Sequence, residues 1–96
     1  MYLKVHEIQN RKIIAVCDKD LIGTIFEEKG LQLKISESFY KGSLLPEKEI
    51  INILKNADNI NLVGKKTIEL ALKNNIISKD NIIKIKGVPH AQIFSL

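Results

Sequence analysis

Cysteine is almost absent from this chain, and its single thiol at Cys17 excludes an internal disulfide bond. The same scarcity argues against a structural zinc site, because Cys17, His6 and His90 are the only soft ligands and no two of them are closely spaced. We therefore predict no bound metal and no cofactor. A lone cysteine also fits a reducing compartment, which favours a cytoplasmic protein.

Long apolar runs are missing as well. No stretch approaches the roughly 20 apolar residues that a membrane-spanning helix requires. Residues 1–7 alternate polar and apolar side chains instead of forming the apolar core of a signal peptide. The sequence thus predicts a protein without a membrane contact, again placed in the cytoplasm.

Aromatic residues supply only 5% of the chain, which disfavours a surface that stacks nucleic-acid bases. Arginine is also scarce, because fourteen of the fifteen basic residues are lysine, which lacks the forked geometry that suits phosphate. An abundance of lysine, isoleucine and asparagine together indicates a compositional bias of the genome. Part of the net charge of +4 is therefore expected to be background.

The basic excess is concentrated in one half of the chain. Residues 1–57 carry nine basic and eight acidic side chains, whereas residues 58–96 carry six and three. A local excess of positive charge is the electrostatic footprint of nucleic-acid binding. We therefore expect RNA or a ribonucleoprotein as the partner, and homo-oligomerisation stays an open possibility.

Length and composition indicate one domain that spans residues 1–96, with an ordinary 45% of apolar and 27% of charged residues. Hydrophobic periodicity predicts the order β-β-α-β-α-β-α-β-β, which is typical of a mixed α/β fold with a mixed parallel and antiparallel sheet. The predicted strands cover residues 2–8, 12–17, 31–35, 59–63, 81–85 and 90–96, and the predicted helices cover 18–30, 46–57 and 65–75.

Three details of this fold prediction are specific enough to test. Asp18 suits the N-cap of the first predicted helix, and Gly30 suits its C-terminal end. Strands 60–63 and 82–85 are predicted to be parallel neighbours, because a helix joins them within one short unit. Residues 36–45 are predicted to be irregular.

Four patches of the sequence together resemble a known family. They are Ala-Val-Cys-Asp at 15–18 with Leu-Ile-Gly at 21–23, Ser-Phe-Tyr at 38–40, Asn-Leu-Val-Gly at 61–64, and Gly-Val-Pro-His-Ala-Gln at 87–92. The family consists of small archaeal proteins known only as domain of unknown function number 424, and the resemblance covers essentially the whole chain. It implies an archaeal cytoplasmic protein with a compact α/β fold. It implies no activity and supplies no functional residues.

A Gly-Lys-Lys-Thr stretch opens a predicted helix directly after a predicted strand. Unpaired N–H groups at a helix start, the helix dipole and two lysines together attract phosphate or carboxylate. The stretch is not a P-loop, because Asn59 stands where that motif needs glycine and Lys66 where it needs serine or threonine. The alternative is a plain strand-to-helix turn with solvated lysines.

A histidine and a glutamine near the C-terminus complete the candidate site. They are two residues apart in a predicted strand, so both face the same side, and Pro89 fixes the backbone before them. The alternative is a structural histidine that bonds to backbone at the sheet edge. The candidate anion- or RNA-binding residues are Gly64, Lys65, Lys66, Thr67, Lys84, Lys86, His90 and Gln92.

Cys17 is predicted to be an inert core residue, because it ends a buried run and Asp18 beside it opposes a thiolate. A nucleophile–base pair would require His90 or His6 to lie alongside it. No catalytic set is recognisable, so the sequence favours a binding protein over an enzyme.

Three hypotheses remain in competition at this point. The first is a small binding module that contacts RNA or a ribonucleoprotein through its basic C-terminal half. The second is a phosphate- or anion-binding protein, or an enzyme, whose pocket lies at residues 64–67 and His90. The third is a protein-interaction subunit that covers an apolar patch by docking or dimerisation.

Overall fold

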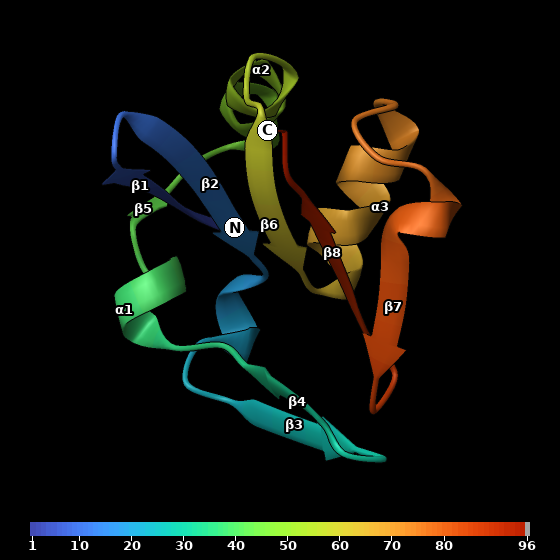
Figure 1. The fold of residues 1–96 in the computed structure, drawn as a ribbon. Helices are drawn as coiled ribbons and strands as arrows, with labels where there is room; N and C mark the ends of the chain where they lie inside the picture. Colours follow the sequence, from blue (N-terminus) through green and yellow to red (C-terminus); the bar gives the residue numbers. More distant parts are fainter. Residues whose placement is uncertain (96) are drawn as a thin grey trace.

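The computed structural model describes residues 1–95, and it confirms the predicted mixed α/β class (Figure 1). The strands are β1 (Tyr2–Ile8), β2 (Arg11–Cys17), β3 (Ile25–Glu28), β4 (Leu31–Lys34), β5 (Ser43–Leu44), β6 (Asn59–Val63), β7 (Ile82–Ile85) and β8 (Val88–Ile93). The helices are α1 (Glu37–Tyr40), α2 (Glu47–Lys55) and α3 (Lys65–Lys73), and short 3₁₀ turns cover Lys19–Leu21 and Lys79–Asn81.

Strand β6 lies near the centre of a six-stranded sheet whose order is β5-β1-β2-β6-β8-β7. It pairs in parallel with β2 and antiparallel with β8, and every other pair in this sheet is antiparallel. All five residues of β6 are buried, as expected of a central strand that is covered on both faces.

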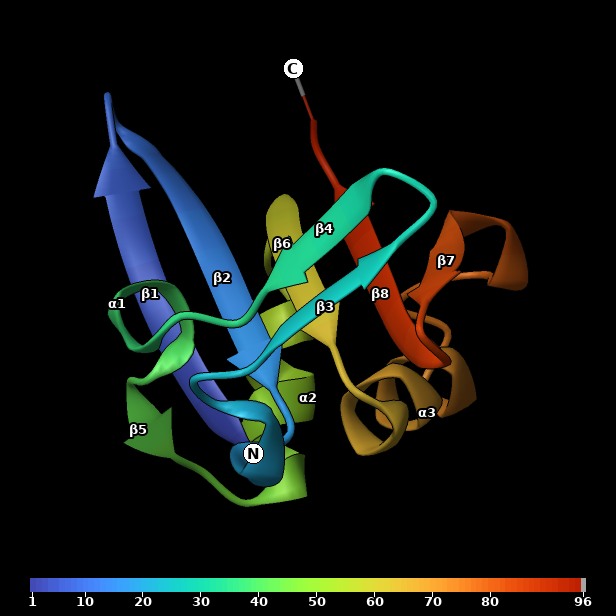
Figure 2. The same cartoon turned by 90° about the horizontal axis from the view of Figure 1, so that it is seen from below.

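Two layers cover the sheet. Helices α2 and α3 pack on one face, where Ile50 and Ile68 join Leu62 in the larger core cluster. Helix α1 and the β3–β4 hairpin cover the opposite face, where Leu33 and Tyr40 belong to a second cluster. Figure 2 shows the hairpin crossing over β6 and β8. Within residues 1–95, none of the helices has the length and apolar character needed to cross a membrane.

The helix predicted for residues 18–30 is wrong, because this segment forms one 3₁₀ turn and the β3–β4 hairpin. Three of its residues have positive φ, namely Gly23 (85°), Lys29 (49°) and Gly30 (82°). Such angles do not fit a right-handed helix, and two consecutive positive values are typical of a tight hairpin turn. The Lys-Gly pair was therefore a turn signal rather than the end of a helix.

Strands 60–63 and 82–85 run parallel, as predicted, but the prediction that they are neighbours is wrong. The two strands share a sheet, but β8 lies between them and pairs antiparallel with both. Lys86 and Gly87, at φ 54° and 77°, form the tight turn that folds β8 back against β7. Strand β7 is left at the sheet edge, where its exposed Lys84 is compatible with an unpaired edge.

The remaining differences are small. The segment 36–45 is not wholly irregular, because Ser36 caps the short helix α1 by accepting a hydrogen bond from the Phe39 N–H. Strand β8 begins at Val88 and ends at Ile93, earlier at both ends than predicted. The last residue of the predicted strand, Leu96, lies outside the described residues.

Candidate functional site

Asp18 caps a helix, although not the helix predicted to follow it in the sequence. Its carboxylate accepts hydrogen bonds from the N–H groups of Lys66 (3.1 Å) and Thr67 (2.8 Å) and from the Thr67 hydroxyl (2.8 Å), so it caps α3. Strand pairing explains this contact. Cys17 ends β2 directly beside Val63 at the end of β6, so the residues after both strands meet at one edge of the sheet.

Gly64 makes room for this cap. Its φ is 111°, a backbone angle that residues with an L side chain rarely adopt. A Cβ added at this position would lie 2.4 Å from the carboxyl carbon of Asp18. The start of α3 therefore already holds an anion that belongs to the protein itself. Thr67 is only 1% exposed, so only Lys65 and Lys66 present exposed side chains at this corner.

Some of the predicted lysines converge elsewhere, on a hollow of about 620 Å³ between α3 and the β7–β8 hairpin. We call it the lysine groove. Its lining residues are Lys65, Ile68, Glu69, Leu72, Lys79, Ile82, Lys84, Gly87 and Pro89. Three lysines from three separate elements thus surround an aliphatic floor, with a single acidic side chain among the lining residues.

Six of the eight predicted site residues do not line the groove, namely Gly64, Lys66, Thr67, Lys86, His90 and Gln92. Lys66 and Lys86 are exposed outside it, and the Lys86 N–H donates to Glu28 Oε1 at 3.0 Å. His90 and Gln92 alternate along β8 with Pro89, which does line the groove, so their side chains face the other side of the sheet. The structure therefore separates the predicted set into two faces.

His90 belongs to a partly buried polar cluster on the hairpin side of the sheet. Its Nε2 lies 3.0 Å from Asn61 Oδ1, and that oxygen also accepts a hydrogen bond from the Tyr40 hydroxyl. Because a carbonyl oxygen only accepts, His90 Nε2 donates. Burial lowers the pKa of His90, so the ring is neutral near pH 7.

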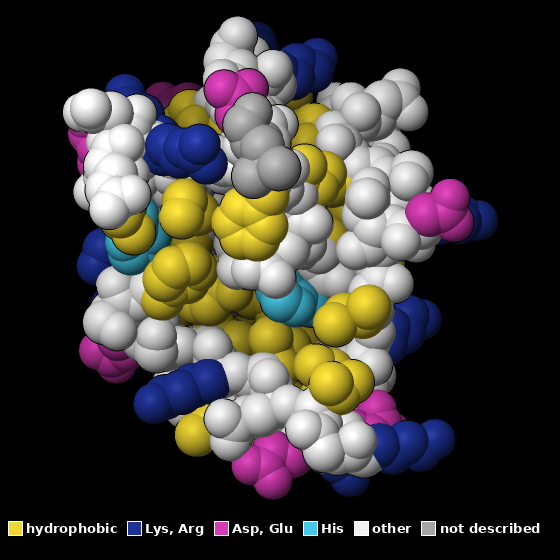
Figure 3. All heavy atoms as spheres, in the orientation of Figure 1, with side chains coloured by type: hydrophobic (Ala, Val, Ile, Leu, Met, Phe, Trp, Pro, Cys, Tyr) yellow, Lys and Arg dark blue, Asp and Glu magenta, His cyan; other side chains and the backbone are white. Residues whose placement is uncertain are grey.

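On the face drawn in Figure 3, hydrophobic side chains gather in the centre, while Lys and Arg lie mostly at the rim.

Cys17 is fully buried, as predicted. Burial, assisted by the negative charge of Asp18, raises the pKa of its thiol to about 12. Val63 pairs with Cys17 on one side and with His90 on the other, so a whole strand separates the thiol from the imidazole. His6 is held elsewhere, at 2.8 Å from the Phe39 carbonyl oxygen. No nucleophile–base pair forms, and residues 1–95 hold no cluster of three potential metal-binding side chains.

Sequence reasoning missed one side chain at each of these two places. Lys79 completes the lysine groove from the 3₁₀ turn before β7, and Asn61 holds His90 from the neighbouring strand. Neither has a local sequence signal, because both depend on which strands pair across the sheet. The excess of lysine after residue 58 was the one indication that a basic surface exists there.

Comparison with known proteins confirms the resemblance to the family. Residues 6–96 match the family described as "Protein of unknown function (DUF424)". The structure is similar to the crystal structure of an uncharacterized conserved protein from Methanopyrus kandleri, an archaeon, with a TM-score of 0.77 and 27% sequence identity. The similarity covers 99% of this chain and 93% of that protein. No protein with a curated description matches the chain.

Proposed function

We propose that this chain, which belongs to the DUF424 family of proteins of unknown function, is a binding module that contacts RNA or a ribonucleoprotein through the lysine groove. The proposal places the protein in the cytoplasm. The observation that carries it is the convergence of Lys65, Lys79 and Lys84 on one hollow.

Charge supports this proposal. The three lysines are exposed, and Glu69 is the single acidic residue that lines the groove. Lysine ammonium groups on flexible stems act as point charges and attract phosphate without a fixed geometry. The residues at the groove therefore favour contact with the phosphate backbone of a nucleic acid over the reading of its sequence.

The floor of the groove indicates how the RNA would lie. Ile68, Leu72, Ile82 and Pro89 form it, and the residues that line it include no aromatic ring. Bases therefore have no ring to stack on, and phosphates are the groups that this groove holds best. We expect binding that varies little with RNA sequence and weakens steeply with salt.

The test is RNA binding by the Lys65→Gln/Lys84→Gln variant, measured by fluorescence anisotropy over a range of salt concentrations. Two lost phosphate contacts predict roughly tenfold weaker binding at low salt and a salt slope flattened by about 1.4 for a single strand. The matched control is Lys29→Gln/Lys48→Gln, which removes the same charge from exposed positions outside the groove. Equal losses in both variants, or no RNA binding at low salt, contradict the proposal.

A pocket for a small anion at residues 64–67 and His90 is the second candidate, and the geometry favours it less. The N–H groups of Lys66 and Thr67 already bind the carboxylate of Asp18, and the neutral His90 faces the other side of the sheet. This candidate predicts that His90→Ala weakens binding of a small phosphorylated ligand. The RNA proposal predicts that His90→Ala leaves RNA binding unchanged.

A further inference from the structure

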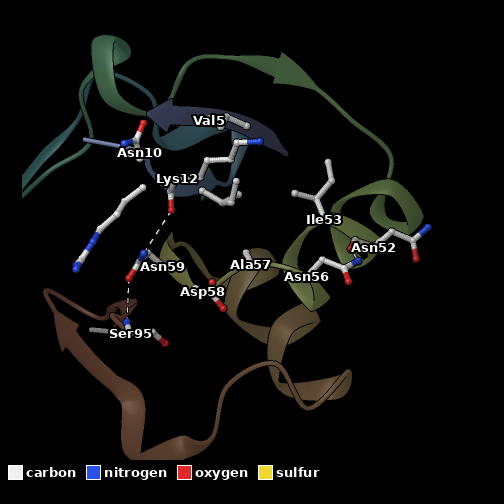
Figure 4. Close-up of a pocket in the computed structure, with 12 residues that line it drawn as sticks. Val5, Asn10, Lys12, Asn52, Ile53, Asn56, Ala57, Asp58, Asn59 and Ser95 are labelled. Carbon is white, nitrogen blue, oxygen red and sulfur yellow. Dashed lines mark hydrogen bonds between the residues drawn. The ribbon is translucent and has the colours of Figure 1, made fainter. Parts of the chain in front are cut away.

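A second hollow of about 900 Å³ lies between the tip of the β1–β2 hairpin and α2. We call it the asparagine cleft, because four asparagines line it. Its lining residues are Val5, Asn10, Arg11, Lys12, Ile14, Asn52, Ile53, Asn56, Ala57, Asp58, Asn59 and Ser95. Figure 4 shows Lys12 and Asn59 on one side and Ile53 and Asn56 of α2 on the other, with Ala57 and Asp58 between them. Its volume lies within the range of about 300 to 1,000 Å³ that is common for small-molecule sites.

Asn59 supplies a fixed floor to the cleft. Its Oδ1 accepts a hydrogen bond from the Ser95 N–H at 2.9 Å, and its Nδ2 lies 3.5 Å from the Lys12 carbonyl oxygen. The side chain is only 7% exposed, so it links the start of β2 to the chain after β8 rather than serving a ligand. These hydrogen bonds fix the Asn59 side chain at the floor of the cleft.

The amides that remain for a ligand come from α2. Asn56 Nδ2 donates to the Asn52 carbonyl oxygen at 2.9 Å, which fixes the side chain and leaves its Oδ1 as an acceptor. Asn52 and Asn56 are both exposed at the cleft. Such amides offer a donor and an acceptor side by side, which matches the hydrogen-bonding edge of a purine or pyrimidine base.

The charged groups of the cleft are of two kinds. Arg11 is the single arginine of the chain, in which all other basic residues except the histidines are lysine, and it lines this cleft together with Lys12. A guanidinium fork binds phosphate oxygens in pairs, which lysine does not. Asp58 supplies a carboxylate, which accepts hydrogen bonds from sugar hydroxyls.

Aliphatic side chains make up the rest of the lining. Val5, 47% exposed, and the half-buried Ile53 and Ala57 present an apolar wall beside the polar groups. A flat ring that packs against such a wall removes apolar surface from water without an aromatic partner. The cleft therefore combines a surface for a ring, amides for its edge, a carboxylate for hydroxyls and a guanidinium for an anion.

We propose that the asparagine cleft binds a ribonucleoside monophosphate. The base packs against Val5 and Ile53 with its edge on the α2 amides, the ribose hydroxyls donate to Asp58, and Arg11 holds the phosphate. This inference does not rest on the RNA-binding proposal, since the two hollows have no lining residue in common.

The test is a titration of the isotope-labelled protein with AMP, GMP, CMP and UMP, each to about 5 mM, followed by amide chemical shifts. At least one nucleotide is expected to bind saturably at a single site, with shifts gathered at the hairpin tip and α2. Inorganic phosphate is expected to bind far more weakly. No saturable binding, equal binding of phosphate alone, or shifts centred on the lysine groove would each overturn the proposal.

Arg11→Lys tests the phosphate contact. It keeps the charge and removes the fork, and about tenfold weaker nucleotide binding is expected, with no change for the unphosphorylated nucleoside. Arg11 is exposed next to the hairpin turn, so the fold tolerates the change. Lys29→Gln, at the tip of the other hairpin, is the control and is expected to leave nucleotide binding unchanged. Equal affinity of the wild type and Arg11→Lys contradicts the assignment.

Asp58→Asn tests the ribose contact. The variant is expected to bind the ribonucleotide several-fold more weakly and to bind the 2′,3′-dideoxynucleotide as the wild type does. The same loss for both nucleotides would mean that Asp58 does not contact the sugar hydroxyls, and the proposed pose would fall.

Discussion

The two ends of β6 differ in the kind of recognition that they offer. At its end, beyond Val63 and Gly64, the lysine groove presents exposed lysines around an aliphatic floor. At its start, Asn59 helps to build the asparagine cleft, where amides, a carboxylate and an arginine stand close together. Point charges select for anions in general, whereas placed donors and acceptors select for one arrangement of atoms. One strand thus separates a surface suited to a polymer from a cavity suited to a small molecule.

The largest expected effect is a loss of stability at the end of β6 that leads to the lysine groove. Gly64→Ala forces a Cβ into a backbone with φ at 111° and against the Asp18 carboxylate. Strain and the loss of the helix cap together are expected to cost about 3 kcal/mol of unfolding free energy. Urea denaturation followed by circular dichroism measures it. A cost below about 1 kcal/mol would show that the cap does not hold the start of α3.

Salt sharpens the comparison between the two sites. Raising NaCl from 50 to 200 mM is expected to weaken single-stranded RNA binding by roughly twentyfold if three phosphates contact the groove. Nucleotide binding in the cleft is expected to fall only about two- to threefold, because a mononucleotide has no condensed counterions to release. Isothermal titration calorimetry at both salt concentrations checks the difference. Equal salt dependence of the two ligands would remove the distinction.

Cys17→Ala is expected to cost about 1–2 kcal/mol of stability and to leave both ligands bound as before. The wild-type thiol also gives stability a pH dependence that the variant lacks. Its pKa rises from an ordinary value of 9.0 to about 12 on folding, so its contribution is complete below pH 9 and declines as the pH rises toward 12. Denaturation curves at pH 7 and 10.5 measure this. Rapid labelling of the native thiol at neutral pH would contradict it.

The smallest expected effect concerns the other end of β6. Asn59→Ala removes the bonds to the Ser95 N–H and the Lys12 carbonyl, which is expected to cost about 1 kcal/mol of stability. Nucleotide affinity in the cleft is expected to fall slightly, and RNA binding at the groove to remain unchanged. A loss of RNA binding in this variant would mean that the two ends do not act separately.

The sequence predicted the parts of this molecule that depend on local pattern. Strands β1, β2 and β6 and helices α2 and α3 were found because apolar periodicity and length agree there. Residues 18–30 were misassigned because Leu21, Ile22, Ile25 and Phe26 fit helical spacing, while the decisive signal was the Lys29–Gly30 turn. The insertion of β8 between β6 and β7 was missed because local sequence patterns do not show which strand pairs with β6.

The candidate sites show the same division. The charge count revealed the basic half of the chain. It did not reveal that Lys79 lines the groove, or that His90 and Lys84 lie on opposite faces of the sheet. No pattern in the sequence predicted the asparagine cleft. Arg11 and Asn56 come from segments far apart in the sequence, and only the docking of α2 beside the β1–β2 tip brings them together.

The N-terminal cap of α3 comes from Asp18, which is far from this helix in the sequence. Its first turn relies on a carboxylate that stands 48 and 49 residues earlier in the chain and reaches Lys66 and Thr67 only after β2 has paired with β6. During folding, we therefore expect α3 to gain a complete N-terminus only after this long loop has closed. In the native state, the same bonds prevent its first turn from fraying. Hydrogen exchange at these two amides should accordingly report the opening of the whole sheet rather than the unwinding of one helix end.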